Sequence, residues 1–238
     1  MPTGPGPWGC EDAAMRALIA PPHVDLPDGT LDDAAVDALY AHDGVLLRLA
    51  FVSTLDGAAT GGDGVSGSIN TEADGRGYRA MGRADDVVLV GAGTARAEEY
   101  GSRSTPLVVV SRRGELPESV REGDGTVVLA TVAYSGVPEG EHVWHVGQDE
   151  VDLVALVQRC RAAFGPHVLC EGGPSLAGDL VAAGLVDELG LSWAPSLVVG
   201  SPEDHPRILR GPAAEVALEP VHLLEEDGTL VGLWRVRR

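Results

Sequence analysis

Two glycine-rich junctions in the sequence have the residue types and spacing to hold a phosphate-bearing ligand. They cover residues 90–94 (VGAGT) and 171–176 (EGGPSL), and each follows a short apolar run typical of a buried strand. Glycine lets a backbone approach a ligand closely, and the free amides at a helix N-terminus bind phosphate. In open α/β sheets, ligands bind beyond the carboxyl ends of the strands. We therefore interpret the two junctions as a joint cradle for the pyrophosphate of a dinucleotide.

The alternative is that these glycines only end their strands, because short glycine motifs arise often without a ligand. Neither junction contains the complete GxGxxG pattern, so neither is the dehydrogenase fingerprint. The dinucleotide interpretation requires both junctions to meet at one site. It fails if they lie on opposite sides of the molecule.

A third strand end carries Ser111, Arg112 and Arg113, directly after the apolar run 106–110. Two guanidiniums beside a hydroxyl suit the 2′-phosphate that distinguishes NADP from NAD. A solvated surface pair is the alternative for these arginines.

A fourth strand end places Asp56 just past the buried run 45–55, at the expected rim of the sheet. A carboxylate there has the chemistry to accept a hydrogen bond from a substrate amine or to relay a proton. An Asx turn that leads into the next loop is the alternative. Asp56 is the candidate catalytic residue.

A serine hydrolase is a rival interpretation of the second junction. Ser175 lies between a strand and a helix, as in a nucleophile elbow, and Asp187, His205 and His222 follow in the chain order of a triad. However, the second small residue of the elbow is alanine, and a proline precedes the serine. These departures disfavour the hydrolase.

Metal, lysine and disulfide chemistry find little support. His142 and His145 form an HxxH pair in a strand-like run with no third ligand in view, so we expect structural histidines and no metal. All 17 basic residues are arginine, which closes every mechanism that needs a lysine. Cys10, Cys160 and Cys170 form no CxxC pair and predict neither a disulfide framework nor a zinc cluster.

The composition is that of an ordinary globular protein, with 44% hydrophobic and 22% charged residues among 238. It favours one large domain, residues 23–238, after an N-terminal segment, residues 1–22, that we expect to be flexible. The net charge of -19 disfavours nucleic acid and anionic membranes as partners. Since neither a long apolar span nor a secretory signal is seen, we expect a cytoplasmic protein.

Short apolar runs alternate with helical patterns along most of the chain. The runs predict strands over residues 45–55, 86–91, 106–111, 126–131, 142–146, 167–171 and 187–193. Helices are predicted over residues 31–40, 71–84, 151–164 and 174–183, the first capped by Thr30. Asp227 and Gly228 favour a tight turn between two last strands within residues 221–236. This alternation is typical of an α/β fold whose mostly parallel sheet is covered on both faces, here with an antiparallel C-terminal hairpin.

Three segments together resemble the pyrimidine reductase family of riboflavin biosynthesis. They are STLDG at 53–57, DDVVLVGAGT at 85–94 and LCEGGPSLAGDLVAAGLVDEL at 169–189, of which the last is the most specific. The resemblance covers residues 45–236. It implies a three-layer α/β/α domain of the dihydrofolate-reductase-like fold, NADPH as cofactor, neither metal nor flavin, and a homodimer.

The reaction that the resemblance implies is hydride transfer to the ribosylamino carbon of an aminopyrimidine phosphate, which gives a ribitylamino product. On this pattern Ser53 and Asp56 face the substrate, while Thr60 and Asp63 lie in a loop beside the nicotinamide. The cofactor contacts expected from the junctions and the resemblance together are Thr60, Asp63, Gly91, Ala92, Gly93, Thr94, Ser111, Arg112, Glu171, Gly172, Gly173, Pro174, Ser175 and Leu176.

The sequence departs from the family in two ways. Many members carry an N-terminal zinc deaminase with HxE and PCxxC signatures, which this sequence lacks, so it resembles a version with the reductase alone. Where the family has a DDP-type segment and an arginine for the substrate phosphate, this chain has residues 96–101 (RAEEYG), followed by Arg103 as the nearby candidate. Two glutamates there repel a phosphate, which leaves dihydrofolate, another pterin or another pyrimidine-like ring open as substrate.

A different class of function also stays open, a protein that binds the dinucleotide without catalysis. A reductase oxidises NADPH when it is offered the right heterocycle, whereas a binding module is only stabilised by it against thermal unfolding.

Overall fold

The computed structural model describes residues 14–21, 30–101, 103–121, 124–201 and 204–238. The strands are β1 (Arg16–Ile19), β2 (Leu46–Thr54), β3 (Val87–Gly91), β4 (Leu107–Val110), β5 (Val127–Thr131), β6 (Val143–His145), β7 (His167–Cys170), β8 (Glu188–Ala194), β9 (Leu218–Glu226) and β10 (Thr229–Val236). The α-helices are α1 (Asp33–Tyr40), α2 (Glu72–Ala84), α3 (Ala92–Ala97), α4 (Leu153–Phe164) and α5 (Pro174–Ala182). Short 3-10 helices are η1 (Ser66–Ser68), η2 (Glu118–Val120) and η3 (Ala133–Ser135).

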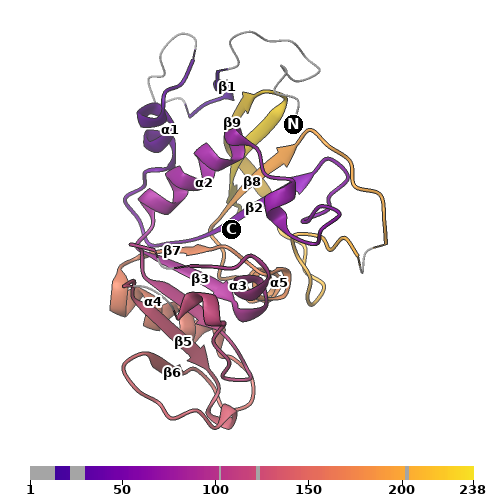
Figure 1. Ribbon diagram of the computed structural model, residues 1–238. Coiled ribbons are helices and arrows are strands. Elements are labelled where there is room, and N and C mark those ends of the chain that lie inside the picture. The colour runs from indigo at the N-terminus through magenta and orange to yellow at the C-terminus, as the bar shows by residue number, and fades with distance from the viewer. Residues whose placement is uncertain (1–13, 22–29, 102, 122–123, 202–203) are drawn as a thin grey trace.

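In the described part of the chain, the strands form one sheet in the order β1-β9-β10-β8-β2-β7-β3-β4-β5-β6 (Figure 1). All pairs from β8 to β6 in this order are parallel, whereas β1, β9 and β10 pair antiparallel, and so do β10 and β8. The predicted mostly parallel sheet with an antiparallel C-terminal hairpin is confirmed. Because the parallel strands run the same way, the carboxyl ends of β2, β3, β4 and β7 meet at one edge of the sheet.

Helices cover both faces of the sheet. One hydrophobic core joins α1, α2 and α3 to the sheet, and a second core joins α4 and α5 to its other face (Figure 1). Strand β2 lies between the two cores, and all its residues but one are buried. This is why its sequence is an almost continuous apolar run and does not alternate.

Local signals explain where the helices begin. Helix α2 starts after Thr71, whose side chain accepts a hydrogen bond from the N–H of Asp74, and the acidic first turn suits the helix dipole. The prediction of Thr30 as the cap of the first helix is wrong, because the helix begins at Asp33 and the cap is Asp32, which accepts from Ala35 N at 2.8 Å. The nearer carboxylate satisfies one of the free amides of the first turn.

Two elements differ from expectation. Within the segment 1–22 that was expected to be flexible, Arg16–Ile19 pair with β9 and Met15 is fully buried; residues 1–13 and 22 lie outside the described residues. Helix α3 was not predicted, because six residues with a glycine among them carry too little periodicity. The turn at Asp227 and Gly228 is confirmed, and both residues have the positive φ that a tight hairpin turn requires.

Cys160 and Cys170 are buried core residues as expected, whereas Cys10 lies outside the described residues. No helix in the described ranges combines the length and apolarity needed to cross a membrane.

Candidate active site

The two glycine junctions meet at the carboxyl edge of the sheet. Strands β3 and β7 are neighbours, and the N–H of Gly91 donates a hydrogen bond to the carbonyl of Gly172 at 2.7 Å. A Cβ atom added to Gly173 would lie 2.4 Å from Thr94 Oγ1, so the approach of the second junction to the first leaves no room for a side chain. The junctions therefore lie at one site, as the dinucleotide interpretation requires.

Gly172 is needed for a conformational reason as well. Its φ is 99°, a region that other residues rarely adopt, and a Cβ there would lie 3.0 Å from the ring of Phe51. The peptide bond to Gly173 is cis. Gly173 is then the N-cap of α5, and Pro174 is its first residue. Pro174 has no N–H, and the next amides, those of Ser175 and Leu176, have no acceptor within the helix.

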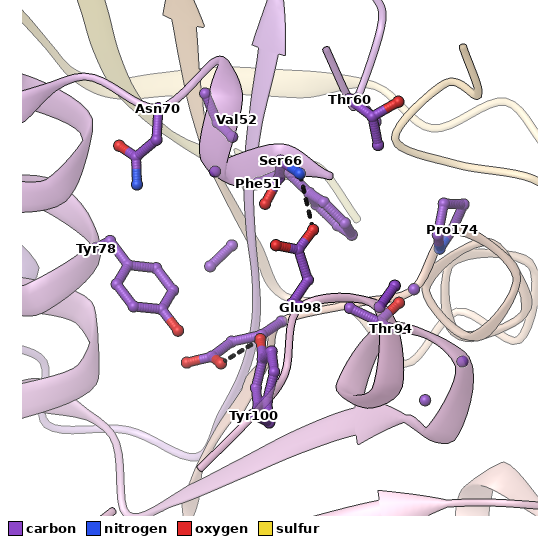
Figure 2. A pocket seen from close by; sticks show the side chains of 18 of the residues that line it. Phe51, Val52, Thr60, Ser66, Asn70, Tyr78, Thr94, Glu98, Tyr100 and Pro174 are labelled. Carbon is purple, nitrogen blue, oxygen red and sulfur yellow. Dashed lines mark hydrogen bonds between the residues drawn. The ribbon is translucent and has the colours of Figure 1, made fainter. Parts of the chain in front are cut away.

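A cavity of about 770 Å³ opens beside the two junctions. Many of the predicted site residues line it, namely Thr60, Gly91, Gly93, Thr94, Arg103, Glu171, Gly173, Pro174, Ser175 and Leu176. Figure 2 shows Asn70 and Tyr78 on one side of this cavity and Thr94 and Pro174 on the other, with Glu98 between them. The glycine turns thus form one end of the cavity, and helix α2 forms the other.

A second cavity of about 670 Å³ adjoins the first, because Gly91, Gly93, Ser175 and Leu176 line both. It is also lined by Ala92 and by the polar strand end Ser111, Arg112 and Arg113. The predicted cofactor residues are therefore distributed along one continuous surface that passes over the glycine turns.

The two arginines of the second cavity differ in their partners. Arg112 forms an exposed ion pair with Glu150 at 3.0 Å. Arg113 has no hydrogen bond or ion pair within the described part of the chain, so its guanidinium is available to an anion. Ser111 is buried, and its hydroxyl accepts from the N–H of Glu115 at 3.1 Å.

In the first cavity, Arg103 is held by Glu171. Its Nη1 lies 3.0 Å from both carboxylate oxygens of Glu171, and its Nη2 donates to the Tyr78 hydroxyl at 3.3 Å. Tyr100 donates to the same carboxylate at 2.8 Å. Burial, with the Glu171 carboxylate beside them, raises the pKa of Tyr78 and of Tyr100, so both hydroxyls stay protonated at neutral pH.

Asp74 contributes a second carboxylate to the same cavity from the first turn of α2. Only 7% of the residue is exposed. Burial raises the pKa of Asp74 to about 6, although a hydrogen bond with Ser192 lowers it. A buried carboxylate in a concave site is the kind of group that binds or protonates a substrate.

The loop between β2 and α2 is attached to α3 across the cavity. Glu98 accepts a hydrogen bond from the N–H of Ser66 at 2.8 Å (Figure 2). In the same loop, the buried hydroxyl of Thr60 lines the cavity without a hydrogen-bond partner among the described residues. A bound ligand that offers a polar group would satisfy it.

Besides Gly172, three predicted site residues lie outside both cavities, namely Ser53, Asp56 and Asp63. Ser53 is buried and its hydroxyl donates to the carbonyl of Thr54. Asp56 accepts from the hydroxyl of Thr54 at 2.6 Å and from the N–H of Val198 at 3.1 Å.

Asp63 accepts from Ser68 and from the N–H of Val65, so it closes its own loop. The placement of these residues against substrate or nicotinamide stays a prediction.

The alternative reading of Asp56 fits the geometry better than a proton relay does. Hydrogen bonds from Thr54 and from Val198 hold the pKa of Asp56 below its usual range, which keeps it ionised and turned into the loop. These hydrogen bonds are those of a local turn at a strand end, and the catalytic role of Asp56 stays a prediction.

The serine hydrolase alternative is wrong. Ser175 follows the carboxyl end of β7, whereas Asp187 precedes the amino end of β8, at the opposite edge of the parallel strands. There Asp187 accepts from the N–H of Leu47 at 2.8 Å. His222 is fully buried, with its ring 4.7 Å from that of Tyr40.

Of the HxxH pair, His145 has a structural role, whereas His142 is exposed and does not fit the expected structural role. His145 Nε2 lies 2.7 Å from the carbonyl oxygen of Val137. The described residues contain no group of three or more His, Cys, Asp or Glu side chains arranged to hold a metal.

Asp74, Tyr78 and Tyr100 are site residues that the motifs did not reveal. A signal for the first two existed in the predicted helix 71–84, because Asp74, Tyr78 and Met81 are spaced i, i+4 and i+7 and so share one face. Asp74 therefore shares the face of this helix that carries the apolar residue Met81 and is expected to pack on the sheet. A carboxylate on such a face indicates a polar group directed into the interior or a cavity.

Comparison with known proteins agrees with this architecture. The chain matches the model of the RibD C-terminal domain over residues 45–230. No curated protein sequence matches it. Among solved structures it is similar to a pyrimidine reductase-like protein from Corynebacterium diphtheriae, at 20% identity and a TM-score of 0.64, over 81% of this chain and 92% of that one.

Two further structures are similar at the level of the fold. The riboflavin biosynthesis reductase Rib7 of Saccharomyces cerevisiae has 15% identity and a TM-score of 0.62, over 83% of this chain and 93% of that one. The diaminohydroxyphosphoribosylaminopyrimidine deaminase/5-amino-6-(5-phosphoribosylamino)uracil reductase of Thermotoga maritima has 18% identity and a TM-score of 0.65. The match covers 81% of this chain and 56% of the Thermotoga chain. The resemblance inferred from the sequence and the dihydrofolate-reductase-like fold class are confirmed, and the chain belongs to the RibD C-terminal domain family.

Proposed function

We propose that this protein is an NADPH-dependent reductase of a small pyrimidine-like heterocycle. The observation that carries the proposal is the hydrogen bond from Gly91 N–H to the Gly172 carbonyl, at 2.7 Å. It brings both glycine turns to the boundary of two adjoining cavities, where an extended ligand with a central pyrophosphate would be bound. Membership of a reductase family supports the same chemistry.

The residues present fit a dinucleotide. The free amides at the start of α5 and the glycines of the β3–α3 turn suit the pyrophosphate. Arg112 and Arg113 suit a 2′-phosphate in the second cavity. In the first cavity the unpartnered hydroxyl of Thr60 suits the polar substituent of a nicotinamide. When bound, the reduced nicotinamide supplies the hydride.

The side chains contribute binding and orientation rather than a covalent intermediate. The chain has no lysine, and burial raises the pKa of Cys170 to about 12, so neither residue type offers a nucleophile there. Phe51, Leu176 and Pro174 give the cavity apolar walls that exclude water. Helix α2 forms one end of the first cavity. There, the protonated hydroxyl of Tyr78 and the carboxylate of Asp74 are polar groups that would orient a heterocycle.

Thermal unfolding with each dinucleotide tests cofactor binding. We expect NADPH to raise the melting temperature more than NADH does, because Arg112 and Arg113 recognise the extra phosphate. The absorbance of NADPH is then followed with the aminopyrimidine phosphate and with dihydrofolate in parallel. Consumption of NADPH with either ring supports the proposal. If NADPH raises the melting temperature but neither ring oxidises it, the protein binds the dinucleotide without catalysis. If NADPH does not raise the melting temperature, the proposal is overturned.

A further inference from the structure

The second cavity carries a carboxylate next to the two arginines that suit a 2′-phosphate. Glu150, Arg112 and Arg113 all line this cavity. Nη1 of Arg112 lies 3.0 Å from Oε2 of Glu150 and 3.3 Å from its Oε1. A carboxylate in this position works against an anion, because it attracts the arginine and repels a phosphate.

The loop between β6 and α4 fixes the backbone of Glu150. Gly147 has a φ of 108°, and a Cβ atom there would clash with the carbonyl oxygen of Glu150, so this turn requires glycine. The N–H of Asp152 donates to the carbonyl of Val146 at 2.9 Å and closes the turn. The side chain of Asp152 then caps α4. Glu150 is therefore held at the cavity by a built turn.

The same loop gives the second cavity an apolar wall. Val151 and Leu153 line the cavity together with Glu150. Ligand pockets combine apolar walls of this kind with a few placed polar groups that fix orientation. An adenosine bound there would have its base against Val151 and Leu153 and its 2′ substituent near Glu150 and Arg112.

The ion pair weakens this site for a phosphate without closing it. The side chains of Arg112 and Glu150 are 67% and 76% exposed, and pairs this exposed are weak. Both contacts use Nη1, so Nε and Nη2 of Arg112 can still donate to a phosphate. What Glu150 removes is mainly the positive charge of Arg112. Arg113 is then the cation of this strand end that no described residue neutralises.

We propose, on the basis of the proposed reductase function, that Glu150 is a specificity-determining residue that restrains the preference for NADPH over NADH. Its carboxylate neutralises Arg112 and repels the 2′-phosphate. The 2′-hydroxyl of NADH meets no such repulsion, and it can donate a hydrogen bond to a carboxylate. The charge of Glu150 thus brings the affinities for the two dinucleotides closer together.

Two fragments of the cofactor test this role without the nicotinamide. Adenosine 2′,5′-bisphosphate carries the 2′-phosphate, whereas 5′-AMP lacks it. In Glu150→Gln we expect the affinity for the bisphosphate to rise about fivefold over the parent, while the affinity for 5′-AMP changes by less than about twofold. Titration calorimetry at low ionic strength measures both affinities. The ratio of NADPH to NADH affinity should rise by the same factor as the affinity for the bisphosphate.

Two further variants and added salt separate charge from packing. Glu150→Asp keeps the carboxylate, so we expect its affinity for the bisphosphate to stay within about twofold of the parent. Glu139→Gln removes the same charge from an ion pair with Arg159 outside both cavities and should leave both affinities unchanged. The gain in Glu150→Gln should shrink as salt rises from about 0.05 M to about 0.5 M, because salt screens exposed charges. A melting curve for each variant confirms that it is folded.

The outcomes separate this inference from the proposed function. An unchanged affinity for the bisphosphate in folded Glu150→Gln, or an equal gain in Glu139→Gln, overturns the inference while NADPH binding by the parent stands. A gain that is the same at low and high salt also overturns it, because charge is then not the cause. If the parent binds neither NADPH nor either fragment, the proposed function fails and this inference fails with it.

Discussion

The carboxylate of Glu98 and the backbone N–H of Ser66 form a hydrogen bond of 2.8 Å that joins α3 to the loop between β2 and α2. Both residues line the first cavity, so the position of this loop at the cavity depends on a residue that follows the glycine turn. The acidic segment 96–101, expected from the sequence only to repel a phosphate, thus also holds the loop in place.

Removal of this contact is expected to affect substrate binding more than stability. In Glu98→Ala the loop loses its attachment, so we expect KM for the heterocycle to rise about tenfold, while the melting temperature changes little because the contact is partly exposed. Steady-state kinetics with varied heterocycle measures the effect. Glu99→Ala is the control, because Glu99 is exposed and, within the described ranges, forms no hydrogen bond or ion pair with this loop. Equal KM values for the two variants would contradict the role of Glu98.

Arg113 is expected to select NADPH over NADH. Its guanidinium lines the second cavity and has no partner among the described residues, whereas Arg112 is already paired with Glu150. Arg113→Ala should lower the ratio of NADPH to NADH affinity about tenfold, because a charge-assisted contact to the 2′-phosphate is lost. Fluorescence titration of both dinucleotides measures the ratio. Arg159→Ala, which removes an arginine from the surface of α4, should leave the ratio of NADPH to NADH affinity unchanged. If this ratio falls more in Arg159→Ala than in Arg113→Ala, a general effect of charge explains the preference for NADPH.

Asp74 is expected to reduce stability at neutral pH. Burial raises its pKa to about 6 in the folded protein, from 3.8 as the ordinary value. The folded protein therefore binds the proton of Asp74 more tightly than the unfolded chain does. The stability that this proton provides is fully present below pH 3.8, the ordinary pKa, and is lost as the pH rises through about 6, the pKa in the folded protein. Asp74→Asn should accordingly stabilise the protein by about 2–3 kcal/mol at pH 7–8, and this gain should vanish as the pH falls below about 4. Urea unfolding of the parent and of Asp74→Asn across this pH range measures the difference in unfolding free energy. If Asp74 only stabilises the fold through its contacts, Asp74→Asn is less stable than the parent at every pH.

Arg48 is expected to be essential for stability although it lies far from the glycine turns in sequence. It is 1% exposed and contacts Asp85 at 3.2 Å and Glu188 at 3.0 Å. Arg48→Met leaves the buried carboxylate of Asp85 without its arginine, while Glu188 keeps Arg235 at 3.4 Å, so we expect a loss of about 3 kcal/mol in unfolding free energy. Arg159→Met removes a partly exposed ion pair with Glu139 and a contact with the Trp144 ring, and should cost no more than about 1 kcal/mol. Denaturant unfolding at neutral pH compares the two, and similar losses would show that Arg48 acts only through its packing.

The buried strands and the glycine turns were predictable because their signals are local. The apolar run of β2 and the turn at Gly172 each reflect a constraint that the neighbouring residues impose. Asp56 was assigned a catalytic role because it stands at a strand end, but its partner Val198 lies 142 residues away and no local pattern reveals it. The burial of Asp74 likewise depends on how α2 packs on the sheet. The dependence on NADPH, the homodimer and the cytoplasmic location stay predictions.

The ion pair between Arg103 and Glu171 joins residues 68 positions apart and decides which charge the cavity offers. If Glu171 is what keeps Arg103 from a phosphate, then Glu171→Gln should release the guanidinium and create affinity for an anion. We expect ribose 5-phosphate to bind Glu171→Gln at least about tenfold more tightly than it binds the parent. Titration calorimetry measures this gain, and the double variant Glu171→Gln with Arg103→Gln is the control that should abolish it. A gain that persists in the double variant would assign the effect to the lost carboxylate alone, and no gain in the single variant would show that Arg103 cannot reach a ligand in the cavity.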